Sequence, residues 1–189
     1  MKKILDKIIR KKKKANYAFV DNENVNVSVQ KQGWKLDREK FIHRLKQEYR
    51  VEKVYMFMWY IKKYQKMYDF FADLGYTLIF KQVNQNPKIP NKWNTDAELV
   101  LHTMIEYVHY DKAIIVTGDG DFACLVEYLR QQSKLSTLIV PNDKRYASTL
   151  NEASKGKLIS LSDFKDVLAY TPGKPKEQFD ESFYDTFYS

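Results

Sequence analysis

Short apolar runs alternate with amphipathic stretches along most of the chain. Runs rich in β-branched and aromatic residues predict strands at 17–20, 51–60, 76–83, 113–117 and 135–140, with a short last strand at 158–159. Apolar positions at a helical period predict helices at about 37–49, 63–74, 95–110 and 122–132, and within 145–154. The stretch before Asp37, which contains Gly33, and residues 84–94, with two prolines and four asparagines, are interpreted as loops.

This regular alternation of strands and helices is typical of an α/β protein. It predicts three layers, with an open, mostly parallel sheet between helices on both faces. A chain of 189 residues suits one such domain. We expect it at residues 15–170, between a basic segment at 1–14 and an acidic, aromatic tail at 171–189. Ligands of open parallel sheets bind beyond the carboxyl ends of the strands, where the strand order reverses.

Four aspartates fall at that edge of the predicted sheet. Asp21 follows the first strand, Asp119 and Asp121 follow the fourth, and Asp96 opens the helix before the fourth. If the first and fourth strands are neighbours, the four carboxylates meet. Two like charges about 4 Å apart repel by about 4 kcal/mol at an effective dielectric near 20, so the group must take up protons or bind a cation. Oxygen ligands suit Mg²⁺ or Mn²⁺. The alternative is that each aspartate caps a turn or helix.

Three segments carry a resemblance to a known family. YAFVDNENVNVSV, NTDAELVLHTM and VTGDGDFACLVEYL occur in this order within roughly residues 17–160. Together they resemble the NYN domain family of PIN-like nucleases, which includes the LabA-like proteins. The resemblance implies a PIN-like α/β/α fold and metal-dependent cleavage of RNA.

The resemblance also implies roles for individual residues. The metal ligands and catalytic acids would be Asp21, Asp96, Asp119 and Asp121. Asn24 would support the site through hydrogen bonds, and the hydroxyl of Thr117 would bond a carboxylate or a phosphate. Many relatives carry an acid six residues after the aspartate that opens the middle helix, whereas this chain has His102.

Further residues are candidates for contact with substrate. Trp93 and Lys92 precede Asp96, and an aromatic ring beside a cation can stack on and neutralise single-stranded nucleic acid. The alternative for Trp93 is a buried anchor of the loop. Lys144 and Arg145 follow the fifth strand at the same edge and are either phosphate contacts or a solvated helix start.

Two acids and the cysteine near these motifs are interpreted as residues without a role in the site. Glu98 lies about 200° around the helix from Asp96, so we expect it to face elsewhere. Glu23 is close to Asp21 in sequence but is more readily explained without a role in the site. Cys124 is expected to be a buried packing residue.

Charge and composition narrow the classes of function. The formal net charge is +8, of which residues 1–14 carry +7, so the rest of the chain is nearly neutral. A basic segment favours nucleic acid or an acidic membrane surface. No apolar stretch approaches the roughly 20 residues that span a bilayer, no leader is evident and there is one cysteine. We therefore expect a cytoplasmic protein without stable membrane insertion, compatible with a monomer or a homo-oligomer.

These observations favour a hydrolase. The expected activity is that of a metal-dependent RNA endonuclease acting on single strands, which leaves 5′-phosphate and 3′-hydroxyl ends. The alternative is a non-catalytic module that uses the same fold to bind RNA or a protein.

Overall fold

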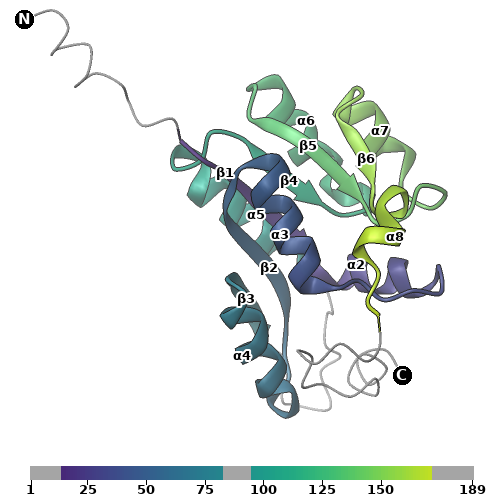
Figure 1. Cartoon of the computed structure of the whole chain (residues 1–189). Coiled ribbons are helices and arrows are strands. Elements are labelled where there is room, and N and C mark those ends of the chain that lie inside the picture. Colours follow the sequence, from purple (N-terminus) through teal and green to yellow (C-terminus); the bar gives the residue numbers. More distant parts are fainter. Residues whose placement is uncertain (1–13, 83–94, 172–189) are drawn as a thin grey trace, which may run out of the picture.

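The computed structural model describes residues 14–82 and 95–171, and its centre is a six-stranded sheet (Figure 1). The strand order is β3-β2-β1-β4-β5-β6, and every neighbouring pair is parallel. The strands are β1 (Asn16–Asp21), β2 (Val51–Tyr60), β3 (Tyr76–Gln82), β4 (Ala113–Val116), β5 (Leu135–Val140) and β6 (Leu158–Ser160). The basic segment except Lys14, and the tail except Thr171, lie outside the described residues.

Helices cover both faces of this sheet, which confirms the predicted three layers. One face carries α2 (Asn22–Gln30), α3 (Arg38–Tyr49), α4 (Gln65–Asp73) and α8 (Lys165–Leu168), with short 3-10 turns at Lys62–Tyr64 and Leu161–Phe164. The other face carries α5 (Asp96–Ile105), α6 (Ala123–Gln131) and α7 (Ser148–Ser154), with 3-10 turns at Glu106–Val108 and Gly120–Phe122.

Alternating side chains of the central strand build two separate cores. Ala18 and Val20 of β1 lie in the core beneath α2, α3 and α4, whereas Tyr17 and Phe19 lie in the core beneath α5, α6 and α7. All four are at most 6% exposed, because a central parallel strand is covered on both sides. Asp21 continues this alternation at the end of the strand, on the α5 side of the sheet.

The predicted strands agree with the observed ones to within one residue at every end, but one helix is shorter than expected. The predicted helix at 95–110 ends at Ile105 and tightens into the 3-10 turn. Beyond it, Tyr110 is fully buried, its ring packs against Tyr17 and Phe19, and its hydroxyl donates to the Thr103 carbonyl. Burial of this aromatic ring turns the chain back under the helix before Tyr110.

Helix α2 occupies residues that the sequence pattern assigned to a loop. Val25, Val27 and Val29 alternate with polar residues, which is a period of two, and β-branched residues are poor helix formers. In the structure Asp21 caps the helix by accepting from the Asn24 N–H, and Val25 and Val29 are buried one turn apart. Capping and tertiary burial therefore override the local pattern.

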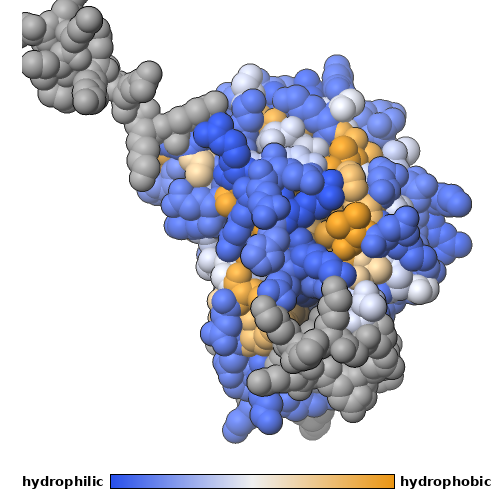
Figure 2. Space-filling view, viewed as in Figure 1, coloured by the Kyte–Doolittle hydropathy of each residue, from blue (hydrophilic) through white to orange (hydrophobic). Residues whose placement is uncertain are grey.

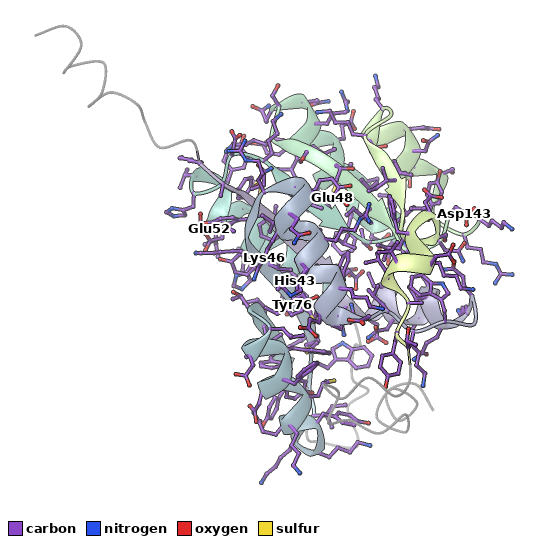
Figure 3. The ribbon with its side chains drawn as sticks, viewed as in Figure 1. His43, Lys46, Glu48, Glu52, Tyr76 and Asp143 are labelled. Carbon is purple, nitrogen blue, oxygen red and sulfur yellow. The ribbon has the colours of Figure 1, made fainter. Side chains whose placement is uncertain are left out.

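The surface is mainly polar. The face in Figure 2 is largely hydrophilic, with smaller groups of apolar residues between hydrophilic ones. Figure 3 shows His43, Lys46 and Glu48 on the outer side of α3, away from the sheet. Across residues 14–82 and 95–171, no helix is both long enough and apolar enough to span a bilayer.

Candidate active site

The site lies where the strand order reverses, between β1 and β4. Val20 of β1 is in register with Val116 of β4, so the chain leaves both strands at the same edge of the sheet. Asp21 follows Val20 directly, and the Gly118–Asp121 turn follows β4. The first and fourth strands are thus neighbours, as the hypothesis of a shared acidic site requires.

Three of the predicted acids converge at this edge. Asp96, Asp119 and Asp121 each offer one carboxylate oxygen, and these oxygens lie within 4.8 Å of one another. Asp96 begins α5, while Asp119 caps the 3-10 turn by accepting from the Asp121 N–H at 3.0 Å. Asp96 and Asp119 are half-buried and Asp121 is exposed. Oxygen donors at this spacing fit a hard divalent cation such as Mg²⁺ or Mn²⁺.

The fourth acid, Asp21, lies deeper. Its side chain accepts two hydrogen bonds, from the Asn24 N–H at 3.2 Å and from the Thr117 hydroxyl at 3.0 Å. The pKa of Asp21 is raised from 3.8 to about 6, chiefly by burial and also by the negative charges of Asp96 and Asp119, while the two hydrogen bonds act to lower it. Asp21 is therefore electrostatically coupled to Asp96 and Asp119.

Asn24 and Thr117 tie the two strand ends together. The Asn24 side-chain oxygen accepts from the Gly118 N–H at 2.8 Å, so the start of α2 is bonded to the turn after β4. The Thr117 hydroxyl donates to Asp21 and accepts from the Asp119 N–H at 3.1 Å. The sequence predicted a carboxylate or a phosphate as the partner of this hydroxyl. Thr117 is completely buried, and the partner that the structure shows is the carboxylate of Asp21.

The two glycines of the turn provide space at this junction. A Cβ on Gly118 would lie 3.2 Å from the Asn24 side-chain oxygen and 3.3 Å from Pro141. A Cβ on Gly120 would lie 2.8 Å from the Ala147 Cβ, closer than side chains approach. Close packing of the turn against α2 and against the loop before α7 thus explains both glycines.

A cavity of about 320 Å³ adjoins the acids. The residues that line it come from α2, with its flanking residues, from the start of α5 and from the turn: Asp21, Glu23, Asn24, Val27, Ser28, Lys31, Thr95, Asp96 and Asp119. Glu23 is a site residue that sequence reasoning gave little weight, and burial together with the charge of Asp21 raises its pKa to about 7. Once residues 22–30 are known to be helical, the spacing of Asn24, Val27, Ser28 and Lys31 places them on one face.

Other predicted candidates lie away from this cavity or outside the described residues. Lys144 and Arg145 are exposed in the loop after β5, whose Asp143 lies at the periphery in Figure 3. This loop contacts the turn through the Ala147 N–H, which donates to the Gly118 carbonyl, but neither cation lines the cavity. Trp93 and Lys92 lie outside the described residues.

Three residues of α5 and α6 complete the comparison with the sequence predictions. Glu98 forms an ion pair with Lys81 at 3.2 Å and does not line the cavity, as its place on the helix predicts. His102 packs its ring near those of Tyr55 and Phe57. The expectation for Cys124 was wrong, because its side chain is exposed on the outer side of α6.

Comparisons with known proteins bear on the family and the fold of the chain. A model of the NYN domain matches residues 17–162. The low amplitude and bright protein LabA of Synechococcus elongatus is 27% identical over 164 residues, which cover 81% of this chain and 87% of LabA. The crystal structure of a protein of unknown function from Vibrio parahaemolyticus matches with a TM-score of 0.70 at 19% identity, over 86% of this chain and 100% of that chain. The last likeness concerns the fold alone.

Proposed function

Because the chain belongs to the NYN domain family of PIN-like nucleases, we propose that it is a metal-dependent ribonuclease that cleaves RNA internally. The observation that carries the proposal is the triad of Asp96, Asp119 and Asp121, whose carboxylate oxygens lie within 4.8 Å of one another beside the cavity. Unneutralised carboxylates this close repel each other. A bound divalent cation would remove this repulsion, which supports the proposal.

The proposed ligands are Asp96, Asp119 and Asp121, with Asp21 as a deeper fourth acid. A divalent cation supplies Lewis acidity, which activates water and stabilises charge on a phosphodiester. The chain holds its acids in place through Asn24 and Thr117, which bond the end of β1 to the turn after β4. Hydrolysis adds water to phosphorus and breaks the bond to the 3′ oxygen, which leaves 5′-phosphate and 3′-hydroxyl ends.

Asp119→Asn tests this proposal. The amide oxygen of asparagine can still accept from the Asp121 N–H, so the cap and the fold should persist while an anionic ligand is lost. We expect cleavage of labelled single-stranded RNA with Mn²⁺ to fall by about 100-fold, or about 2.7 kcal/mol of transition-state stabilisation. Mn²⁺ should also raise the melting temperature of the wild type more than that of the variant.

Asp73→Asn is the matched control. Asp73 ends α4 and is exposed, and its substitution removes one carboxylate elsewhere on the protein. Its cleavage rate and its stabilisation by Mn²⁺ should equal those of the wild type. Full activity of a folded Asp119→Asn protein would remove Asp119 from the mechanism. RNA binding without cleavage by the wild type would instead favour a non-catalytic RNA-binding module.

A further inference from the structure

Helix α2 presents three different faces. Val25 and Val29 face the core, and both are at most 1% exposed. Asn22 and Asn26 accept hydrogen bonds from Arg38, which holds a second face against the start of α3. The third face lines the cavity, and with the residue that follows the helix it carries Asn24, Val27, Ser28 and Lys31. Helix α2 is therefore a wall that leads away from the acids.

Lys31 is the cation among the described residues that line this cavity. The charged side chains that share the lining are carboxylates: Asp21, Glu23, Asp96 and Asp119. Lys31 is exposed, and within the described part of the chain its ammonium group has no ion-pair partner. By contrast, Lys40 lies 3.3 Å from a carboxylate oxygen of Asp37. The positive charge of Lys31 thus remains available to an anion.

The neighbouring Gln32 fixes the position from which Lys31 extends. The Gln32 side-chain amide donates to the carbonyl oxygens of Pro141 at 2.8 Å and Ser28 at 2.9 Å. Its side-chain oxygen accepts from the Ser162 hydroxyl at 2.7 Å. These bonds join the end of α2 to the segments that follow β5 and β6, so the backbone at Lys31 is held to the folded body.

The length of α2 separates Lys31 from the acids. Ten residues of helix span about 15 Å along its axis, which is the distance between the backbones of Asp21 and Lys31. An anion bound at Lys31 would therefore occupy a different position from one held beside Asp21. A cavity of about 320 Å³ is at the lower end of the roughly 300–1,000 Å³ typical of small-ligand sites. This volume is large enough for one nucleotide of a strand.

We propose that Ser28 and Lys31 form a subsite for a backbone phosphate of single-stranded nucleic acid, beyond the phosphate that is cleaved. The inference rests on the proposed nuclease function and adds the route of the substrate, along α2. The Lys31 ammonium attracts the phosphate, and the Ser28 hydroxyl, which lines the same wall, is a neutral donor for it. The subsite attracts a polyanion that the neighbouring carboxylates repel.

Lys31→Gln tests the subsite with two substrates, in the presence of Mn²⁺. Single-stranded RNA carries phosphates beside the scissile one, whereas bis(p-nitrophenyl) phosphate is a lone phosphodiester. The ratio of kcat/KM for RNA to that for the small diester should fall about tenfold, through KM, because about 1.4 kcal/mol of phosphate binding is lost. Lys31→Arg should restore the ratio. Lys66→Gln, which removes an exposed charge from α4, should retain it.

The salt dependence of RNA binding gives an independent measurement. With metal omitted, removal of one lysine–phosphate interaction should reduce the log–log slope of affinity against salt by about 0.7 for a single strand. If Lys31→Gln lowers kcat/KM equally for RNA and for the small diester, Lys31 supports the acidic site. If it lowers kcat/KM for neither, Lys31 is a solvated lysine. Both results would overturn the inference. If the wild type cleaves neither substrate, the proposed nuclease function fails, and an unchanged binding slope would then reject the subsite as well.

Discussion

At the scale of single residues, Asp21 is a carboxylate whose charged form is unfavourable in the folded protein. The residue is 4% exposed and lies near two other acids, so the folded protein favours its protonated form more than the unfolded chain does. The hydrogen bonds from Asn24 and Thr117 reduce this cost without removing it. A bound cation would stabilise the ionised form of Asp21. Without a cation, the folded protein is destabilised by this charge once the pH exceeds the pKa of about 6.

The stability of the metal-free protein should therefore depend on pH through Asp21. The folded pKa of about 6 exceeds the unfolded value of 3.8, so between these values the folded state binds more protons. This group's contribution to the free energy of unfolding should fall as pH rises through that window and then level off, by about 3 kcal/mol in all.

Urea unfolding with a chelator present, compared between wild type and Asp21→Asn, isolates this contribution. Asparagine also serves as a helix N-cap, so the start of α2 is retained. The free energy of unfolding of the variant relative to wild type should rise between pH 4 and pH 7. A constant difference across this range would show that the pKa of Asp21 is not raised in the folded protein.

The sequence identified the acids more readily than their cationic neighbour. Asp96, Asp119 and Asp121 are found from motifs that place them directly at the ends of strands and helices. Lys31 has no such motif, because its position depends on the hydrogen bonds of Gln32 to distant segments. A residue whose place is set by such tertiary contacts cannot be found from local pattern alone.

At the scale of secondary structure elements, the same distinction separates β1 from α2. Strand β1 is buried on both faces, so its apolar run is evident in the sequence. Helix α2 is held by partners outside itself, chiefly Arg38, which is 2% exposed and donates to Asn22 at 2.7 Å and to Asn26. The local sequence pattern does not predict these hydrogen bonds. The pattern therefore misses α2, which provides one wall of the cavity.

Arg38→Lys should loosen α2 selectively. A lysine ammonium lacks the planar fork of a guanidinium and cannot reproduce its set of hydrogen bonds. Hydrogen bonds to charged groups contribute about 1.5–3 kcal/mol each, so amide hydrogen exchange in residues 22–30 should become at least about tenfold faster. RNA cleavage should fall as well, because Asp21 and Asn24 lie at the start of this helix.

The comparison needs a control helix and a control arginine. Helix α6 lies on the opposite face of the sheet, and its exchange should change less than that of α2. Arg50→Lys, at an exposed position after α3, should leave both helices as in the wild type. Uniformly faster exchange in α2 and α6 of Arg38→Lys would show that Arg38 supports the whole fold and does not hold α2 specifically.

At the scale of the whole molecule, the strand order and the distribution of charge serve different parts of the proposed reaction. The order β3-β2-β1-β4-β5-β6 places β1 beside β4 and so assembles the acids at one edge. The alternation of strands and helices predicts a parallel sheet but not the order of its strands, so the sequence left the pairing of β1 with β4 as a condition that the structure meets. The net charge of +8 is concentrated in residues 1–14, which carry +7 and leave about +1 for the rest. The folded body therefore has little long-range attraction for a polyanion.

We expect residues 1–14 to supply most of that attraction. Lysine and arginine release counterions from phosphates, so each phosphate interaction that deletion of this segment removes should reduce the log–log salt slope by about 0.7. RNA binding should weaken, while cleavage at saturating RNA should stay close to that of the full chain, because the acids belong to the folded body. Fluorescent RNA titrated at several salt concentrations without metal measures the binding.

Two further variants separate attraction from structure. The first variant replaces Lys11, Lys12 and Lys13 by glutamine, which removes three positive charges. It keeps Lys14, which donates to the Val108 carbonyl, so a change in RNA binding reports the lost charge and not the loss of that hydrogen bond. Deletion of residues 172–189, which include the acids Asp180 and Asp185, tests whether the tail competes with RNA for the basic segment, in which case binding should tighten. Identical slopes for all variants would reject the segment as an RNA-binding element, because its charge would then bind no phosphate. A large loss of maximal rate would instead mean that residues 1–14 help to build the active site.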